Sequence, residues 1–268
     1  MLLDVHGHPP RDRGQVPALL AALARFDSRV LIAELGALTA GWEHDPSVEH
    51  WREGNALCAE LVRQHPDRLV GYCYVNPAHP REALDEMERR LLGQPETFAA
   101  LKLWVAVRCS DPRLDPLMEF CAAHDVPVLQ HTWLKVGAGG PGGDNLPGES
   151  TPMDLAALAR RHPHVKFFAG HAGGDWEWGV AALARADNVW LDVAGGEAAG
   201  GYANLALRSV GAGRIVFGTD VPGRSVASQL AKLLALEVPA ADLERMLWRN
   251  AAGVLGARLP AAWRERYR

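Results

Sequence analysis

The sequence has little cysteine, and no arrangement of it that indicates a metal cluster or a redox pair. The 268 residues contain four cysteines, Cys58, Cys73, Cys109 and Cys121. No two of them have C-x-x-C spacing, so we interpret them as reduced, mostly buried thiols of a cytoplasmic protein. A cysteine nucleophile has no supporting pattern either.

Long apolar runs and basic blocks are also absent. No stretch reaches the roughly 18 apolar residues of a membrane span. The first residues, Met1 to Asp4, include an early acid and lack the apolar centre of a signal peptide. The formal net charge is −4, so neither nucleic acid nor an anionic membrane is expected as a partner.

Motifs for nucleotides and for serine nucleophiles are missing as well. There is no Walker phosphate loop and no G-x-S-x-G nucleophile elbow. Gly137 to Gly142 formally match G-x-G-x-x-G, but they lie well past the preceding strand, and Pro141 with Gly143 prevents a helix from starting there. We expect the glycine-rich stretch from Thr132 to Ser150 to be a lid over a site.

What the sequence does contain is a regular alternation of strands and helices. Eight strands are predicted, at Leu2–His8, Arg29–Leu35, Arg68–Val75, Phe98–Val105, Val126–His131, Val165–His171, Asn188–Val193 and Arg214–Asp220. The helices between and after them are predicted at Gln15–Phe26, Ser47–His65, Pro80–Leu92, Asp115–His124, Asp175–Arg185, Tyr202–Val210, Ser225–Leu236 and Ala240–Leu255. One more helix is predicted to begin after the cap residue Thr151, with Pro152 in its first turn.

This alternation predicts a parallel α/β sheet. Eight units in a chain of this length favour a single (β/α)8 TIM barrel over residues 1–268, with an extra C-terminal helix. The alternative is an open doubly wound sheet, which would bind its ligand at one switch point. Only the barrel brings the ends of strands one, five, six and eight to the same mouth.

Chemically active residues gather at those strand ends. His6 and His8 are two residues apart on the first strand, so their rings point to one side. His131, His171 and Asp220 end strands five, six and eight. Buried imidazoles and a carboxylate are costly unless a partner compensates them, and a divalent metal does so. The pair His162 and His164 precedes a strand and therefore lies at the opposite, stability-related end.

The motifs together resemble the amidohydrolase superfamily of metal-dependent barrels. The resemblance rests on five segments: His6-Gly7-His8, Gln130-His131, Gly170-His171-Ala172-Gly173-Gly174, Phe217-Gly218-Thr219-Asp220 and the C-terminal run Arg249 to Gly256. The resemblance covers nearly the whole chain. Within the superfamily, the chain most resembles the amidohydrolase-related branch, which contains aminocarboxymuconate-semialdehyde decarboxylase. The superfamily pattern does not specify a substrate.

The resemblance implies a role for each matching residue. His6, His8, His131 and Asp220 would hold one divalent metal, with Zn²⁺ expected first and Mn²⁺ or Fe²⁺ as alternatives. Asp220 would also accept the proton of a water. His171 would polarise the substrate or orient the water, or be a further ligand. The metal would lower the pKa of the water and polarise a carbonyl.

Lys102, on the fourth strand, leaves several interpretations open. In two-metal members of the superfamily a lysine there is carbamylated and bridges the metals. Lys102 could instead be a cation for a substrate carboxylate, a group supporting the ligands, or a lysine that reaches solvent. The branch resemblance favours one metal and an unmodified lysine.

Other residues near the mouth are weaker candidates. Asp192 could orient a ligand histidine, and Glu34 could face either the cavity or the helices. Aromatic and charged residues of the loops either contact a flat substrate or simply close the mouth: Trp42, His44, Trp104, Trp133, Lys135, Asp175 and Trp176.

These observations predict a metal-dependent hydrolase that attacks the ester, lactone or amide carbonyl of a small molecule. The alternative is a non-oxidative decarboxylase of a small unsaturated or aromatic acid, for which Lys102, Arg108 and Lys135 are candidate cations. A metal-holding barrel without catalysis is a third reading. Whether the chain forms a homo-oligomer is left open.

Overall fold

The computed structural model describes residues 1–35, 44–137, 139–174, 176–195 and 201–268. Eight strands form one parallel sheet in which each strand lies beside its neighbour in chain order. They are β1 (Leu2–Gly7), β2 (Ser28–Ile32), β3 (Leu69–Tyr74), β4 (Phe98–Leu103), β5 (Val128–Leu134), β8 (Phe167–Gly174), β9 (Val189–Asp192) and β10 (Ile215–Val216).

The sheet closes on itself, which confirms the predicted barrel. The Val5 amide donates to the Phe217 carbonyl at 3.0 Å, and the Asp220 amide donates to the His6 carbonyl at 2.7 Å. The ladder between β10 and β9 ends at Val216 because the residues after it turn to β1 instead. Closure places the last residues of the first and last strands side by side.

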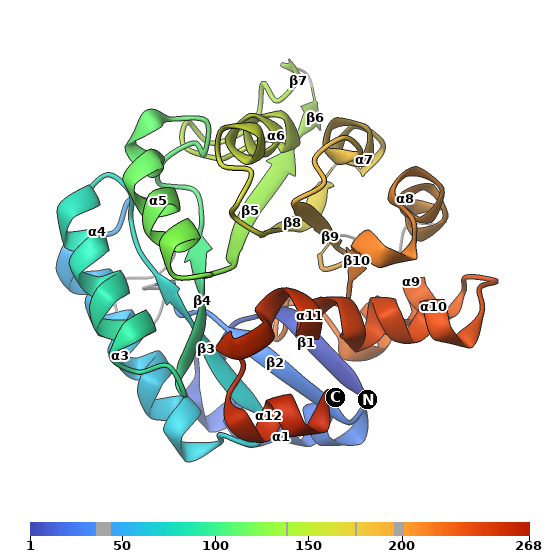
Figure 1. The fold of residues 1–268 in the computed structure, drawn as a ribbon, viewed down its shortest axis with the longest axis horizontal. Coiled ribbons are helices and arrows are strands. Elements are labelled where there is room, and N and C mark those ends of the chain that lie inside the picture. The colour runs from blue at the N-terminus through green and yellow to red at the C-terminus, as the bar shows by residue number, and fades with distance from the viewer. Residues whose placement is uncertain (36–43, 138, 175, 196–200) are drawn as a thin grey trace.

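Helices surround the sheet, as Figure 1 shows. The α-helices with described bounds are α1 (Val16–Arg25), α3 (Val48–Gln64), α4 (Pro80–Met87), α5 (Asp115–Ala123), α6 (Pro152–Arg161), α7 (Trp176–Leu183), α8 (Tyr202–Val210), α9 (Val226–Leu234), α10 (Ala240–Glu244), α11 (Asn250–Leu255) and α12 (Ala261–Arg266). Short 3-10 turns are η1 (Arg13–Gln15), η3 (Pro112–Leu114), η4 (Ala212–Arg214) and η6 (Gly256–Arg258), and π-turns are η2 (Glu88–Leu92) and η5 (Arg245–Arg249).

Two details differ from the sequence prediction. The helix predicted from Pro80 ends as an α-helix at Met87 and continues as the π-turn η2, and the same change of winding links α10 to α11 through η5. The short helix α12 was not predicted. It brings the C-terminus beside the N-terminus (Figure 1), where the Tyr267 hydroxyl donates to the Leu2 carbonyl at 2.7 Å.

The predicted helix caps are present. Ser47 accepts the His50 amide at the start of α3. Thr151 and Asp154 form a reciprocal capping box at the start of α6, with Pro152 in the first turn.

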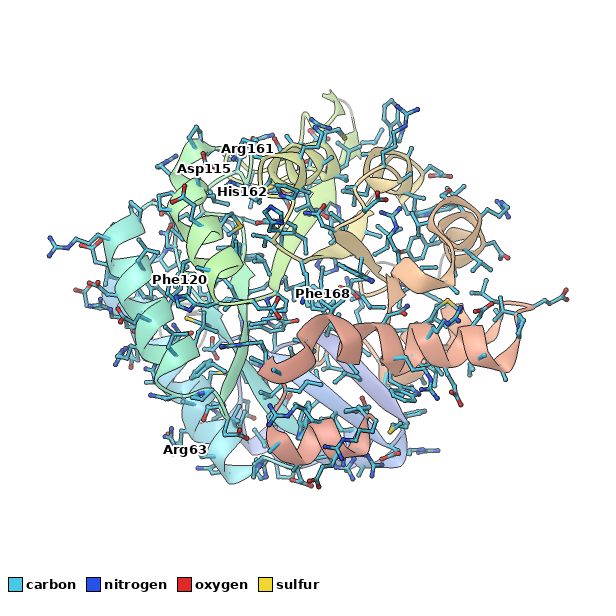
Figure 2. All side chains as sticks on the ribbon, in the orientation of Figure 1. Arg63, Asp115, Phe120, Arg161, His162 and Phe168 are labelled. Atoms are coloured by element: carbon cyan, nitrogen blue, oxygen red, sulfur yellow. The ribbon has the colours of Figure 1, made fainter. Side chains whose placement is uncertain are left out.

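The N-terminal face of the barrel has a structural role, as predicted. His162, at the end of α6, makes a 2.8 Å contact from Nε2 to Oδ1 of Asp115 at the start of α5, and Arg161 binds the same oxygen. Figure 2 shows these three side chains together on the outer helices, with Phe168 of β8 away from them. His162 is thus a link between helices, and His164 is exposed.

The core fills the barrel and the layer between sheet and helices. Every residue of β1, β3 and β4 is buried. Lys102 is among them, with 1% of its surface exposed, which excludes a side chain that reaches solvent. None of the helices in the described ranges is both long and apolar enough to cross a membrane.

The capping box gives a testable prediction. Burial alone would raise the pKa of Asp154, but hydrogen bonds from Ser110 and Thr151 outweigh it and lower the pKa below its ordinary value of 3.8. We expect Asp154→Ala to lower the free energy of unfolding by about 1–2 kcal/mol near neutral pH. Because the folded-state pKa is depressed, this difference should shrink as the pH falls from about 5 to below 3.8, where the carboxylate becomes protonated.

Urea unfolding of both proteins across that pH range measures the effect. Asp67→Ala is the matched control, since the Asp67 side chain is 73% exposed. A loss of stability at Asp154 that does not change with pH would contradict the charge-based account.

Candidate metal centre

A cavity of about 200 Å³ lies at the C-terminal ends of the strands and contains every residue that the sequence predicted for the site. It is lined by His6, His8, Leu35, Lys102, Trp104, His131, Trp133, His171 and Asp220. The strands β1, β4, β5 and β8 and the segment after β10 each contribute to it. Barrel closure, rather than any local sequence, brings these side chains together.

His6, on β1, and His8, the first residue after β1, each use one ring nitrogen for support. His6 Nδ1 lies 2.6 Å from Oδ2 of Asp192, at the end of β9, and His8 Nδ1 lies 2.7 Å from the Ala33 carbonyl. The Ala33 oxygen can only accept, so His8 carries a proton on Nδ1. Burial, followed by the nearby Lys102, lowers the pKa of His6 well below its ordinary value, so its ring is neutral. The Nε2 atoms of both rings are left on the side of the cavity that both residues line.

Asp220 approaches these nitrogens from the other side of the barrel closure. Its Oδ1 lies 3.4 Å from His8 Nε2 and 3.9 Å from His6 Nε2. Its backbone has a φ of +66°, in the left-handed region, four residues after the end of β10. Burial favours the neutral acid, but the contact with His8 holds the pKa of Asp220 well below its usual range.

These three side chains form a donor set that suits a divalent metal. The ligand atoms of His6, His8 and Asp220 all lie within 4.8 Å of one another, and no other such group occurs among the described residues. Two neutral imidazoles and a carboxylate fit Zn²⁺, Mn²⁺ or Fe²⁺. Their supported second nitrogens are the usual companions of metal-binding histidines.

Lys102 lies at the same place. Its Nζ is 3.1 Å from His6 Nε2, and burial lowers its pKa to about 8. The ammonium group thus contacts a nitrogen that the metal would use. Whether Lys102 is carbamylated beside a second metal, or stays a free amine, remains a prediction.

His131 lines the cavity but stands outside the three-residue group. Its Nε2 lies 3.3 Å from Oε1 of Glu149, a buried carboxylate in the segment before α6. Its role as a third nitrogen ligand therefore remains a prediction. Sequence reasoning missed Glu149, because it lies outside any strand or helix and belongs to no periodic pattern.

His171 lies between the other rings. Its ring centroid is 4.6 Å from that of His6 and 5.0 Å from those of His131 and Trp133. Its φ is +63°, and its Nδ1 lies 3.3 Å from the Ala194 carbonyl. Burial, and then the adjacent imidazoles, lower its pKa well below the ordinary value. A neutral ring in this position can donate or accept a hydrogen bond inside the cavity.

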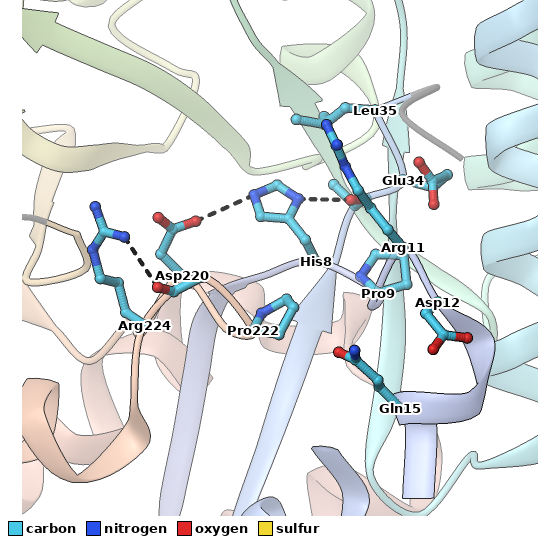
Figure 3. Close-up of a pocket in the computed structure, with 12 residues that line it drawn as sticks. His8, Pro9, Arg11, Asp12, Gln15, Glu34, Leu35, Asp220, Pro222 and Arg224 are labelled. Atoms are coloured by element: carbon cyan, nitrogen blue, oxygen red, sulfur yellow. Dashed lines mark hydrogen bonds and ion pairs between the residues drawn. The ribbon is translucent and has the colours of Figure 1, made fainter. Parts of the chain in front are cut away.

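A second, larger pocket of about 480 Å³ adjoins the cavity and shares His8, Leu35 and Asp220 with it. Its remaining lining residues are Pro9, Arg11, Asp12, Gln15, Ala33, Glu34, Pro222, Gly223 and Arg224. Figure 3 shows His8 beside Asp220, with Arg224 on the Asp220 side and Arg11 on the other. Glu34 thus lines this pocket, and sequence reasoning missed the two arginines.

The loop candidates have mixed outcomes. His44 lies over Trp104, with ring centroids 5.6 Å apart. Lys135 binds Glu149 rather than lining the cavity, and Arg108 contacts Asp154 and the Pro147 carbonyl. Two further candidates, Trp42 and Asp175, lie outside the described residues.

The family model described as amidohydrolase matches residues 3–257 of the chain. The chain belongs to this family. None of the curated proteins matches it in sequence. The barrel of this amidohydrolase also matches several solved structures over nearly their whole length. The sequence identities are low, so these matches show the fold alone.

Three of these structures are representative. The 2,6-dihydroxybenzoate decarboxylase from Rhizobium has a TM-score of 0.72 at 15% identity, over 95% of this amidohydrolase and 98% of that chain. The 4-oxalomesaconate hydratase from Rhodopseudomonas palustris has a TM-score of 0.71 at 14% identity, over 99% and 98%. A dihydroxybenzoic acid decarboxylase from Polaromonas, with manganese and the inhibitor 2-nitroresorcinol, has a TM-score of 0.68 at 19% identity, over 95% and 96%.

The contact between Asp192 and His6 gives a testable prediction. We expect Asp192→Asn to weaken divalent-metal binding by about 10- to 100-fold, because the carboxylate orients His6 and increases its basicity. Titration of the metal-free protein with Mn²⁺ measures the dissociation constant. Asp187→Asn is the control, since its side chain is 99% exposed. An unchanged dissociation constant in Asp192→Asn would show that Asp192 does not support the site.

Proposed function

We propose that this amidohydrolase binds one divalent metal through His6, His8, Asp220 and His131, and hydrolyses the ester, lactone or amide carbonyl of a small substrate. The observation that carries the proposal is the convergence of His6, His8 and Asp220, whose ligand atoms lie within 4.8 Å of one another, at the junction of the two cavities. The Asp220 carboxylate beside His8 is placed to accept the proton of a water at this point. Zn²⁺ is the metal we expect first.

Each residue has a distinct part in the proposed reaction. A bound divalent metal supplies Lewis acidity, which lowers the pKa of a water and polarises a carbonyl. Asp220 accepts the proton of the attacking water and returns it to the leaving group. His171, held near the Ala194 carbonyl, stabilises the developing negative charge on the substrate oxygen. Lys102 supports the same charge from β4.

Decarboxylation is the second candidate, and a specific observation favours it. Lys102 is a buried amine in a cavity flanked by Trp104 and Trp133, which suits the carboxylate and the flat ring of an aromatic acid. Several structural neighbours are named as decarboxylases of hydroxylated benzoates. In this reaction Asp220 would take a proton from a solvent water and pass it to the ring carbon as the bond to the departing carbon dioxide breaks.

The surroundings of the site support a small substrate and a reducing compartment. The two adjoining spaces, of about 200 and 480 Å³, accommodate a small molecule rather than a polymer. All four cysteines are buried free thiols, and we propose on that ground that the protein is cytoplasmic.

Metal content is the first test of the proposal. Protein prepared without chelator should contain close to one divalent metal per chain, and removal of the metal should abolish activity on any substrate found. Elemental analysis provides the count. Close to two metals would indicate a carbamylated Lys102, and none after reconstitution would refute the metal-dependent function.

The second test separates the two reactions. Metal-loaded protein is offered lactones, esters and hydroxylated benzoic acids in ¹⁸O-labelled water. Hydrolysis should place ¹⁸O in the product carboxylate, whereas decarboxylation should release carbon dioxide without such labelling. Turnover of benzoates alone would replace the first candidate by the second.

Asp220→Asn tests the proton-transfer role common to both reactions. We expect the rate on the identified substrate to fall by at least about 100-fold, because the amide cannot accept the proton. Metal content is measured in the same sample, so that loss of metal is distinguished from loss of the base. A variant that keeps both metal and full activity would exclude Asp220 as the base.

A further inference from the structure

The segment before α6 contains a carboxylate that contacts the site from outside the cavity. Glu149 is 4% exposed and does not line the cavity. Its Oε1 lies 3.3 Å from His131 Nε2, while its Oε2 accepts from Lys135 Nζ at 2.8 Å and from the Leu146 amide at 3.0 Å. A buried carboxylate with three partners, one of them on the site, needs an explanation.

The backbone holds Glu149 in place. Its amide donates to the Leu146 carbonyl at 2.9 Å, and the next residue, Ser150, accepts the Trp133 amide at 2.9 Å. The Ser150 hydroxyl oxygen accepts from the Cys109 amide at 2.9 Å and from the Gln130 side chain at 3.2 Å. The carboxylate is therefore fixed against β5, the strand that carries His131.

This arrangement determines which nitrogen of His131 carries the proton. Glu149 Oε2 accepts from the Lys135 ammonium and the Leu146 amide, which can only donate, so Oε1 acts as the acceptor toward His131 Nε2. An imidazole that binds a metal is neutral and carries one N–H. That N–H must lie on Nε2, which leaves the lone pair on Nδ1.

We infer that Glu149 is a positioning residue that holds His131 in its Nε2–H tautomer, so that Nδ1 serves as the third nitrogen ligand of the metal. The inference rests on the proposed function, because it assigns His131 to the metal. It extends the site to a carboxylate supplied by the last residues of the glycine-rich stretch. His6 and His8 are supported in the same way, by Asp192 and the Ala33 carbonyl.

Metal binding tests the inference without a substrate. Metal-free protein is titrated with Co²⁺, whose visible absorption reports the number and type of ligands. We expect Glu149→Met to weaken Co²⁺ binding by about 10- to 100-fold and to change the spectrum. In a His131→Gln background the same substitution should have no further effect, since the residue it positions is gone.

Lys135→Met is the matched control. The substitution removes the other side-chain partner of Glu149 and leaves the contact between Glu149 and His131 in place. The Lys135 side chain that it replaces is 38% exposed. We expect a much smaller loss of Co²⁺ affinity than in Glu149→Met. Thermal unfolding of the metal-free variants shows whether each is folded. If Glu149→Met lowers the Co²⁺ affinity equally in the native and the His131→Gln backgrounds, the role of Glu149 is merely structural and the inference is overturned.

A second measurement keeps the inference separate from the proposed function. The ¹⁵N spectrum of histidine-labelled, metal-free protein reports the tautomer of each ring, and the His131→Gln variant assigns the signal. His131 should show a protonated Nε2 in the native protein and a shift toward the other tautomer in Glu149→Met. A protonated Nδ1 in the native protein would refute the inference. Native protein that takes up no Co²⁺ would instead refute the proposed function, while the spectrum still decides whether Glu149 sets the tautomer.

Discussion

The site depends on the hydrogen bonds that close the barrel between its first and last strands. Asp4, fully buried on β1, accepts the amide of His6 and both the amide and the hydroxyl of Thr219. Burial, which outweighs these hydrogen bonds, raises the pKa of this carboxyl well above its ordinary value. A buried acid of this kind is tolerated only where its oxygens are paired. Asp4 thus links His6, itself a donor group of the site, to Thr219, which directly precedes Asp220, so closure of the barrel also brings these donor groups together.

The charge balance of the cavity explains why it suits a divalent cation. Two carboxylates, the buried Asp192 and the partly exposed Asp220, lie beside His6, whose imidazole burial keeps neutral. Burial raises the pKa of Asp192 to about 6, and Lys102 contacts the nitrogen of His6 that the metal would use. The ammonium of Lys102 partly offsets the negative charge there. A divalent metal would offset it more completely, because it can contact all the donor atoms at once.

The periphery of the site is built differently from its centre. The central donors come from strand ends, whose positions the barrel determines. Glu149, Arg11 and Arg224 come from connecting segments, whose course depends on local hydrogen bonds such as those of Ser150 with β5. Chemistry common to many barrels can thus be kept at the centre while the segments around it adapt to a particular substrate.

The sequence by itself determined the barrel and the central donors. Strand and helix periodicity predicted eight units, and position at a strand's C-terminal end separated His6, His8, His131, His171 and Asp220 from the outer His162. The alternation of side chains along β4 left open whether the Lys102 side chain points into the barrel or reaches solvent. Its burial in the structure decided between these two alternatives. Asp192 was expected to orient a ligand histidine, and the tertiary structure identified that histidine as His6. The tertiary structure alone revealed that Glu149 contacts His131. Those contacts join residues far apart in sequence or on irregular backbone, where neither a period of 2 nor one of 3.6 constrains which atoms meet.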